Sequence, residues 1–447
     1  MSPRAKSQEP RAKSQELRAK SQRLEARSQE LFFMITRRVF LRNGALAVVG
    51  TAALPSFLQR AAFGVVDSAA TRNKRLVVIF QRGAADGLNI VVPHAESAYY
   101  AMRPSINIPR NSVIDLDGFF GLHPSMSAFQ PLWKQGHLAI VHAAGSPDPT
   151  RSHFDAQDFM ESGTPGVKAT DDGWLNRSLR ALPAQPDKSA FRAIALGPSL
   201  PRILTGSEPA VAMNNINDFG VGGRNPNAAP IANTFEAMYN QSVDTVLHGT
   251  GRETFDAVKM LKSADVSNYK PAPGANYPNG RFAESLKQLA QLIKANLGVQ
   301  VAFADIGGWD HHVNEGSTQG QIANILGEFS GSLAAFWNDL GNLAEDTVVV
   351  TMSEFGRTAR ENGNRGTDHG HANVMFVMGG PVKGGKVYGR WPGLDQSQLY
   401  EGRDLAVTTD FRKVMGEAVS RHLGNKNLDS VFPGFENQTA SFLKILG

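Results

Sequence analysis

The sequence contains no cysteine. Disulfides, thiolate metal ligands, iron–sulfur clusters and a thiol nucleophile are therefore excluded. Any metal must be held by nitrogen and oxygen atoms, and any covalent nucleophile must be a hydroxyl, carboxylate, amine or imidazole. The chain also lacks G-x-S-x-G, H-E-x-x-H and G-x-x-x-x-G-K-[ST] patterns and a sound G-x-G-x-x-G. These absences disfavour hydrolases with a nucleophile elbow, zincins, P-loop proteins and dinucleotide-binding proteins.

The main part of the chain has no excess of positive charge. The formal net charge is +5, but residues 1–33 contribute +4 and residues 34–70 contribute +3, which leaves −2 on residues 71–447. A nucleic-acid partner is therefore not expected for this part.

The first residues repeat with a period of seven between positions 4 and 31, as RAKSQEP, RAKSQEL, RAKSQRL and EARSQEL. Each unit has at most one apolar residue at its end, and such a heptad buries too little surface for a stable coiled coil. We expect residues 1–33 to be a disordered tail without a role in the fold. Met34 is an alternative start of the chain.

An export signal is predicted for residues 34–70. Arg37 and Arg38 precede a mild apolar run from Gly44 to Leu54, which is too short to span a bilayer as a helix. Paired arginines before a weak apolar core are typical of a twin-arginine signal, and cleavage is expected after Ala70. The alternative is a chance Arg-Arg pair before an ordinary helix. The signal predicts a periplasmic or otherwise exported protein that uses the twin-arginine translocase and has no stable membrane span when mature.

Residues 71–447 alternate short apolar runs with helical patterns. Such an order predicts an α/β fold, with a mostly parallel sheet sandwiched by helices. Residues 199–280 are rich in Asn, Gly and Pro, and we expect them to form an insertion with one helix near 254–263. The expected strands are Leu76–Phe80, Leu138–Val141, Ala193–Leu196, Gln300–Ile306, Thr347–Met352 and Val374–Met378, and the clearest helices are Arg281–Leu297 and Ile322–Leu340.

Polar residues that can bind a metal gather in the loops at the ends of these strands. Asp310 and His312 follow one strand, and His369 and His371 precede another. Alternate residues of an extended loop point the same way, so each pair is expected to converge on a divalent metal. Zinc fits best, and calcium, magnesium and manganese are alternatives. The competing interpretation is Asp–His hydrogen bonding in solvated turns.

A hydroxyl nucleophile is the second candidate feature. Ser152, followed by His153, stands at an expected helix start, where the helix dipole and a metal favour an alkoxide. The alternative is that Ser152 is only a helix N-cap. Arg357 is a candidate to hold an oxyanion.

Several longer segments resemble the bacterial family called domain of unknown function 1501. The resemblance covers roughly residues 74–445 and rests on LVVIFQRGAADGLNIVVPH, RSHFDAQDFMESG, DDGWLNRSL, GGWDHH, VVVTMSEFGRTARENGNRGTDHGHAN, GGKVYGRWPGL and TTDFRKV. The family is similar in fold to the alkaline phosphatase and sulfatase superfamily. The resemblance thus implies an alkaline phosphatase-like α/β sheet with a dication site at its strand ends.

The resemblance also implies roles for particular residues. The metal ligands would be Asp86, Asp310, His312, Glu354, His369 and His371, and Ser152 would be the nucleophile. The sequence departs from the superfamily pattern at Phe355, where a histidine ligand is expected. A single-metal or rebuilt site is therefore favoured over a full two-metal site.

Two hypotheses on function follow. The first is an exported metal-dependent hydrolase that acts on a small anionic phosphate or sulfate ester. The second is a non-catalytic periplasmic or surface protein that keeps the hydrolase fold and binds a ligand in the same cleft.

Overall fold

The structure is a computed structural model that describes residues 47–49, 73–168, 170–182, 189–216, 260–261, 269–435 and 441–447. The chain divides into two units, residues 1–39 and 40–447, and the following concerns the second. The expected tail (1–33) and export signal (34–70) lie outside the described residues, apart from the three-residue strand β1.

A sheet of ten strands forms the centre of the described residues, in the order β1-β8-β7-β9-β2-β10-β11-β6-β12, with β13 paired to β6. Its strands are β1 (Ala47–Val49), β2 (Arg75–Arg82), β6 (Leu138–Gly145), β7 (Ala193–Leu196), β8 (Ala210–Met213), β9 (Val301–Gly307), β10 (Thr347–Met352), β11 (Asn373–Gly379), β12 (Lys386–Tyr388) and β13 (Thr409–Asp410). A smaller antiparallel sheet joins β3 (Val91–Val92), β5 (Gly121–Leu122) and β4 (Ile114–Asp115).

The central sheet is mixed but mostly parallel. Strands β8, β7, β9, β2 and β10 run parallel to one another, while β11 is antiparallel to both of its neighbours, β10 and β6. The expectation of a parallel strand at Val374–Met378 was wrong in direction, because a buried apolar run looks the same in either orientation.

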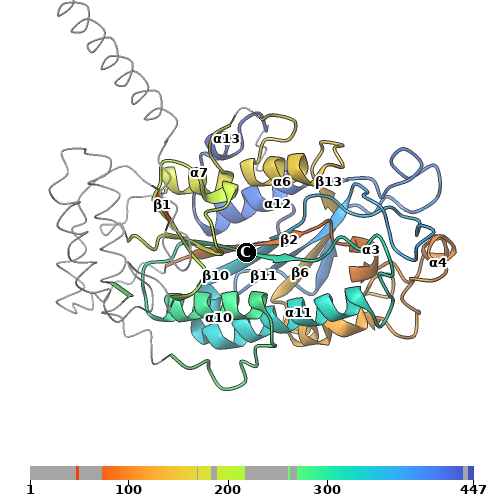
Figure 1. Ribbon diagram of the computed structural model, residues 1–447, viewed down its shortest axis with the longest axis horizontal. Coiled ribbons are helices and arrows are strands. Elements are labelled where there is room, and N and C mark those ends of the chain that lie inside the picture. The colour runs from red at the N-terminus through yellow and green to blue at the C-terminus, as the bar shows by residue number, and fades with distance from the viewer. Residues whose placement is uncertain are drawn as a thin grey trace, which may run out of the picture. The chain divides into compact units, whose positions relative to one another are not determined.

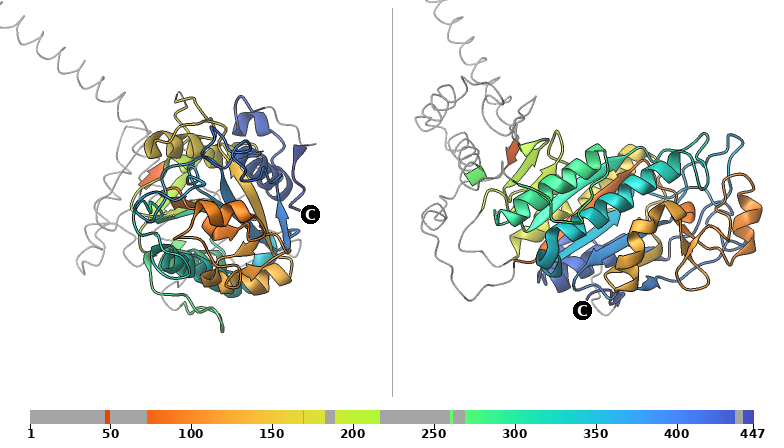
Figure 2. Two further views of the ribbon diagram at one scale, coloured as in Figure 1. Left: turned by 90° about the vertical axis from the view of Figure 1, so that its right-hand side faces the viewer. Right: turned by 90° about the horizontal axis from the view of Figure 1, so that it is seen from below.

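Helices cover both faces of this sheet (Figures 1 and 2). Helices α10 and α11 lie on one face, and α6, α7, α12 and α13 lie on the other. The helices of the described residues are α3 (Gly87–Ile90), α4 (Ser97–Met102), η1 (Pro124–Phe129), α5 (Gln130–Lys134), α6 (His153–Ser162), α7 (Trp174–Arg180), η2 (Arg202–Leu204), α10 (Arg281–Lys294), α11 (Gln321–Leu340), η5 (Gly341–Asp346), α12 (Phe411–Glu417), η6 (Ala418–His422) and α13 (Leu428–Val431). The expected class, an α/β fold whose sheet is sandwiched by helices, is confirmed.

Strand β2 separates the two hydrophobic cores. Val77 and Ile79 pack with the apolar faces of α10 and α11, whereas Leu76, Val78 and Phe80 pack with residues of α7 and α12. This alternation follows from the period of two along a strand, with both faces buried. The sheet is therefore a rigid support for the loops at its edges.

The segment expected as an insertion is in part a piece of the sheet. Strand β8 lies within 199–280 and pairs in parallel with β7, so the sheet extends further along the chain than composition indicated. Most of the remainder, including nearly all of the helix expected near 254–263, lies outside the described residues. Among the residues described here, none of the helices has the length and apolar character that a membrane crossing requires.

Candidate metal centre

Three loops meet at one edge of the central sheet: those after β6 and β9, and the connection between β10 and β11. The chain leaves β6 toward His153, β9 toward Asp310 and His312, and β10 toward Glu354, all at the carboxyl ends of strands that share one direction. His369 lies before β11, and because β11 is antiparallel its amino end reaches the same edge. Active sites of open α/β sheets form at this edge.

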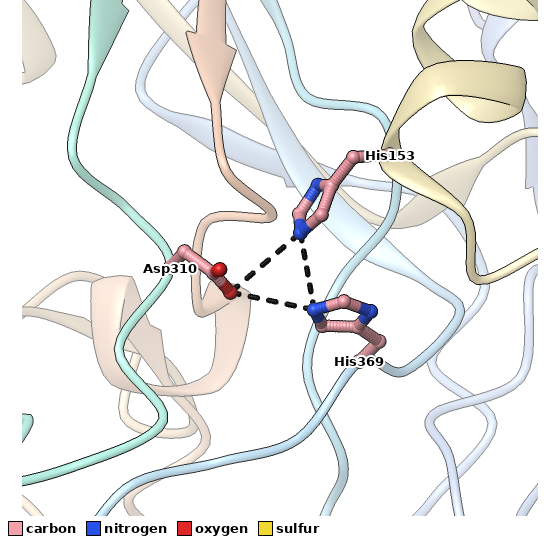
Figure 3. A group of neighbouring side chains, drawn as sticks. All are labelled: His153, Asp310 and His369. Carbon is pink, nitrogen blue, oxygen red and sulfur yellow. Dashed lines mark hydrogen bonds and ion pairs between the residues drawn. The ribbon is translucent and has the colours of Figure 1, made fainter.

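The side chains from three of these loops point their metal-binding atoms at one another (Figure 3). His369 Nε2 lies 3.0 Å from His153 Nε2 and 3.3 Å from Asp310 Oδ1, and the His153–Asp310 distance is 3.6 Å. His312 Nε2 joins them at 3.0 Å from His369 Nε2 and 3.0 Å from Asp310 Oδ1. We call His153, Asp310, His312 and His369 the histidine–aspartate cluster.

Each imidazole of the cluster is oriented from behind by an acceptor on its other nitrogen. Nδ1 of His153 faces Glu354 Oε1 at 2.8 Å, and Nδ1 of His312 faces Asp368 Oδ1 at 3.1 Å. Nδ1 of His369 faces the Arg151 carbonyl oxygen at 2.9 Å. These acceptors favour the tautomer with the proton on Nδ1, which leaves a lone pair on every Nε2.

The cluster therefore brings the Nε2 atoms of His153 and His369 and a carboxylate oxygen of Asp310 around one point, while His312 Nε2 lies beside the latter two residues. A proton on one imidazole would satisfy one of these contacts, whereas a dication would satisfy all of them. For a tetrahedral zinc ion with ligands at 2.0–2.1 Å, neighbouring ligand atoms lie about 3.3 Å apart. The distances of 3.0–3.6 Å among His153, Asp310 and His369 match this spacing, and a donor set of two imidazoles and one carboxylate suits zinc.

Charges around the cluster shift the pKa values of its members. The hydrogen bond that His153 donates to the Glu354 carboxylate raises the pKa of His153. Burial lowers the pKa of His369. Burial alone would raise the pKa of Asp310, but the hydrogen bond and charge of Arg357, which lies 2.5 Å away, outweigh it and lower that pKa. Asp310 is therefore held as a carboxylate, the form that binds metals.

Solvent reaches the cluster, while its supports are buried. The Asp310 side chain is 47% exposed and that of His312 is 39% exposed, but the side chains of Glu354 and Arg357 are fully covered. Phe355 packs beneath the site, with its ring 5.0 Å from that of His153 and 5.1 Å from that of His369. Phe355 thus forms an apolar floor where the superfamily pattern implied another ligand.

Two glycines let the beginning and the end of the connection between β10 and β11 approach each other. Gly370 N donates to the Gly356 carbonyl oxygen, and Gly356 N donates to the His371 carbonyl oxygen, both at 2.8 Å. A Cβ atom at Gly356 would lie 1.8 Å from the Ala372 oxygen, and one at Gly370 would lie 2.3 Å from the Arg357 backbone. Only glycine fits there, because the two backbones are in contact.

Arg357 is placed beside the cluster as a support. Its guanidinium donates to the carbonyl oxygens of Ala84, Gly83, Trp309 and Thr367 and to Asp310. These bonds join the loops after β2 and β9 to the loop before β11, and they occupy the donors expected to hold an oxyanion. Arg357 therefore positions Asp310, and its geometry favours this role over direct contact with a substrate.

Ser152 is the N-cap of α6. Its Oγ accepts a long bond of 3.5 Å from Asp155 N, and His153 of the cluster follows it directly. The N-cap alternative considered from the sequence thus describes its geometry. The cap bond is weak at this length, so the hydroxyl is not tied to one role.

Asp86 lies in a different cluster from the one expected. Its carboxylate is bonded to both terminal nitrogens of Arg103, and all of these atoms are buried. Burial and the charge of Asp86 raise the pKa of the neighbouring Glu315 well above its usual range. Arg103 thus satisfies the carboxylate that the resemblance assigned to a metal.

Glu354 and His371, also expected as ligands, point elsewhere. Glu354 Oε1 accepts from Gly83 N, Gln157 Nε2 and His153 Nδ1, so it stands behind a ligand rather than beside the metal. His371 Nε2 faces the Ser146 carbonyl oxygen at 3.1 Å. Alternation along the loop holds for Asp310 and His312 but fails for His369 and His371, because Gly370 between them packs against another backbone.

Sequence reasoning missed several members of this site. His153 was expected to take part in catalysis, yet the structure places it among the converging metal-binding atoms. The acceptors Asp368 and the Arg151 carbonyl were not foreseen, nor was the buried Glu315. The D-H-G-H spacing carries a signal for Asp368, but a backbone carbonyl leaves none.

The fold and the site together define an α/β protein with a histidine–aspartate cluster at the carboxyl edge of its sheet. A family described as "Protein of unknown function (DUF1501)" matches residues 73–431, and the chain belongs to this family. A comparison with curated proteins found no match.

The chain is also similar in structure to several solved hydrolases. A PsFucS1 sulfatase from Pseudoalteromonas sp. has 11% sequence identity and a TM-score of 0.38, over 92% of this chain and 79% of that one. A phosphonate monoester hydrolase of Agrobacterium radiobacter has 9% identity and a TM-score of 0.34, over 81% and 78%. An alkaline phosphatase from the Antarctic bacterium TAB5 has 10% identity and a TM-score of 0.26, over 71% and 95%.

Proposed function

We propose that the protein is a metal-dependent hydrolase of phosphate or sulfate esters. The observation that carries the proposal is the convergence of three imidazole Nε2 atoms and the Asp310 carboxylate at a solvent-open sheet edge, with every imidazole oriented from behind. Such support is the usual environment of a functional metal site. Catalytic zinc sites use three protein ligands and keep one position open, and the group of His153, Asp310 and His369 supplies three.

The residues of the cluster have separate tasks in this proposal. His153, His369 and Asp310 would hold one dication, preferably zinc, and leave a further coordination position for the substrate, with His312 beside them. When bound, the ion supplies a Lewis acid that withdraws electrons from the ester and lowers the pKa of a coordinated hydroxyl or water. Arg357 keeps the Asp310 carboxylate charged and in place, while Glu354 accepts from Nδ1 of His153 and directs its Nε2 toward the ion.

Ser152 is the proposed nucleophile. It lies one residue from His153 at the N-terminus of α6, where the helix dipole stabilises negative charge on its oxygen. Attack by Ser152 Oγ on phosphorus or sulfur would break the bond to the leaving alcohol and leave an ester on the serine, which water then cleaves. Direct attack by water, without an ester on Ser152, is the alternative that the test below separates.

The test measures metal content and turnover on the same preparations. The wild-type chain, purified without chelators, should carry about one dication per chain by elemental analysis and hydrolyse 4-nitrophenyl phosphate or 4-nitrophenyl sulfate. His369→Ala and Asp310→Ala should lose most of the metal and the activity. Ser152→Ala should keep the metal and lose turnover, and Arg110→Ala, an exposed arginine, should change neither.

Each contrary result has a definite meaning. Full activity in Ser152→Ala would assign the attack to water. A wild-type chain that binds metal and cleaves no ester would make the binding-protein hypothesis the better one. A chain that binds no dication would contradict the proposal itself.

We also propose that the protein reaches the periplasm through the twin-arginine translocase, on the strength of Arg37 and Arg38 before a weak apolar run. Changing both arginines to lysine should leave the precursor in the cytoplasm, as measured by fractionation and immunoblot. Normal export of this double variant would refute the proposal.

A further inference from the structure

A polar pocket adjoins the histidine–aspartate cluster. Its volume is about 240 Å³, and its wall includes Thr358, Arg360, Asn362, Asp368 and Arg403. We call it the arginine pocket.

Two of its residues touch the cluster directly. Asp368 Oδ1 faces His312 Nδ1 at 3.1 Å and also accepts from Asn362 Nδ2 at 3.1 Å. Arg403 donates to the His369 carbonyl oxygen at 2.8 Å. A small molecule bound at the cluster can therefore extend into the pocket without leaving the protein surface.

The acidic groups of the pocket are already occupied. The Glu361 carboxylate accepts from Ser105 N, Ser105 Oγ and Ile106 N. Asp368 is held by His312 and Asn362, as described above. Among the described residues neither carboxylate forms a hydrogen bond or ion pair with Arg360 or Arg403, and Arg403 acts on Asp368 only through its charge.

The arginines, in contrast, keep free hydrogen-bond donors. The Arg360 side chain is exposed and has no hydrogen-bond or ion-pair partner within the described part of the chain. Arg403 has only a long contact of 3.7 Å with Asp404 Oδ2 besides its bond to the His369 carbonyl. The hydrogen-bond donors that remain free in the pocket thus belong to guanidinium groups. Their planar geometry suits carboxylates, phosphates and sulfates.

We infer that the arginine pocket binds a second acidic group of the substrate. The substrate class is then an organic phosphate or sulfate ester that carries another anionic group a few bonds from the ester. Arg360 is the specificity-determining residue, with Arg403 beside it. This inference rests on the proposed function, because it takes the ester to lie at the cluster.

The test compares the binding of a phosphonate with that of phosphonates that also carry a carboxylate. The enzyme cannot hydrolyse these probes, because their P–C bond is not an ester. Zinc-loaded full-length protein is titrated by calorimetry with methylphosphonate, phosphonoacetate, 3-phosphonopropionate and 4-phosphonobutyrate. One carboxylate spacing should bind about fivefold more tightly than methylphosphonate at low salt, with the advantage falling as salt rises.

The variants isolate Arg360. Arg360→Gln should bring that affinity ratio close to one and leave the zinc content and the affinity for methylphosphonate unchanged. Arg360→Lys should retain part of the ratio. Arg390→Gln, an exposed arginine outside the pocket, should behave as the wild type.

Two outcomes would overturn the inference while the proposed function stands: equal affinity for all four probes, or an Arg360→Gln variant that weakens methylphosphonate as much as the carboxylated probes. If the zinc-loaded protein binds none of the probes, the ester-binding cluster of the proposed function is wrong and the inference falls with it.

Discussion

Glu354 acts on the cluster through His153 without joining it. Its buried Oε1 accepts from three donors, one of them His153 Nδ1 at 2.8 Å. The carboxylate therefore sets both the tautomer and the direction of the ring whose Nε2 faces the metal position. The neutral amide of glutamine has the same shape but binds these donors less strongly.

We expect Glu354→Gln to lower zinc affinity about 10- to 100-fold, because outer partners of metal-binding histidines have effects of this size. Competition with a chromogenic chelator measures the affinity, and Glu345→Gln, at an exposed position, serves as the matched control. An unchanged affinity in Glu354→Gln would mean that His153 is oriented by its packing on Phe355 instead.

His142 makes stability depend on pH. Burial lowers its pKa to about 4, below the ordinary value of 6.5, so the unfolded chain takes up the proton first. The free energy of unfolding therefore falls as pH drops from about 6.5 toward 4, and the contribution of His142 shrinks by about 2 kcal/mol between pH 7.5 and pH 5. Urea unfolding at the two pH values should show a smaller loss in His142→Gln than in the wild type. Equal losses would show that other groups carry the acid sensitivity.

The sequence predicted part of the site at the level of single residues. Asp310 and His312 converge as alternation along the loop indicated, since nothing interrupts that loop between them. Asp86 does not take part, because Arg103, seventeen positions away, takes its carboxylate. No pattern of residue types encodes such a long-range choice between two partners for one side chain.

At the level of elements, the glycine contact between the two ends of the connection from β10 to β11 holds His369 in place. A Cβ atom at Gly370 would meet the backbone of Arg357 at 2.3 Å, whereas one at Gly363, in the same connection, has no atom within 4 Å. The two positions thus form a matched pair for substitution.

We expect Gly370→Ala to push the two ends of this connection apart and to lower zinc affinity at least tenfold. The fold should be destabilised by about 1–3 kcal/mol, the usual cost of overpacking. Gly363→Ala should change neither zinc titration nor thermal unfolding appreciably. If both variants behaved alike, the backbone contact would not be what sets the position of His369.

The strands themselves were largely predictable, because continuous apolar runs mark strands that are buried on both faces. Ala193–Leu196 and Thr347–Met352 match β7 and β10 at both ends. The direction of β11 was not predictable, since it depends on the path of the chain between strands and not on the residues within one. That direction is nevertheless what brings His369 to the site.

At the level of the whole molecule, a metal at the cluster would link loops that are distant in sequence. A ligand that binds only the folded state stabilises it by about 2.7 kcal/mol at a hundredfold excess over Kd. We therefore expect a chelator to lower the Tm of the wild type and added zinc to restore it. His369→Ala should show the lower Tm with or without the chelator. A wild-type Tm that ignores both treatments would argue against a metal bound to the folded chain.

The antiparallel course of β11 also makes the cluster depend on an assembled sheet. His153 and His369 are 216 positions apart, yet their Nε2 atoms meet at 3.0 Å. Before β11 is placed between β10 and β6, the chain already contains His153, Asp310 and His312. His369 is then not yet held beside them. The complete set of ligands thus comes together only after nearly the whole sheet has formed. Metal binding would therefore report that the chain is fully folded.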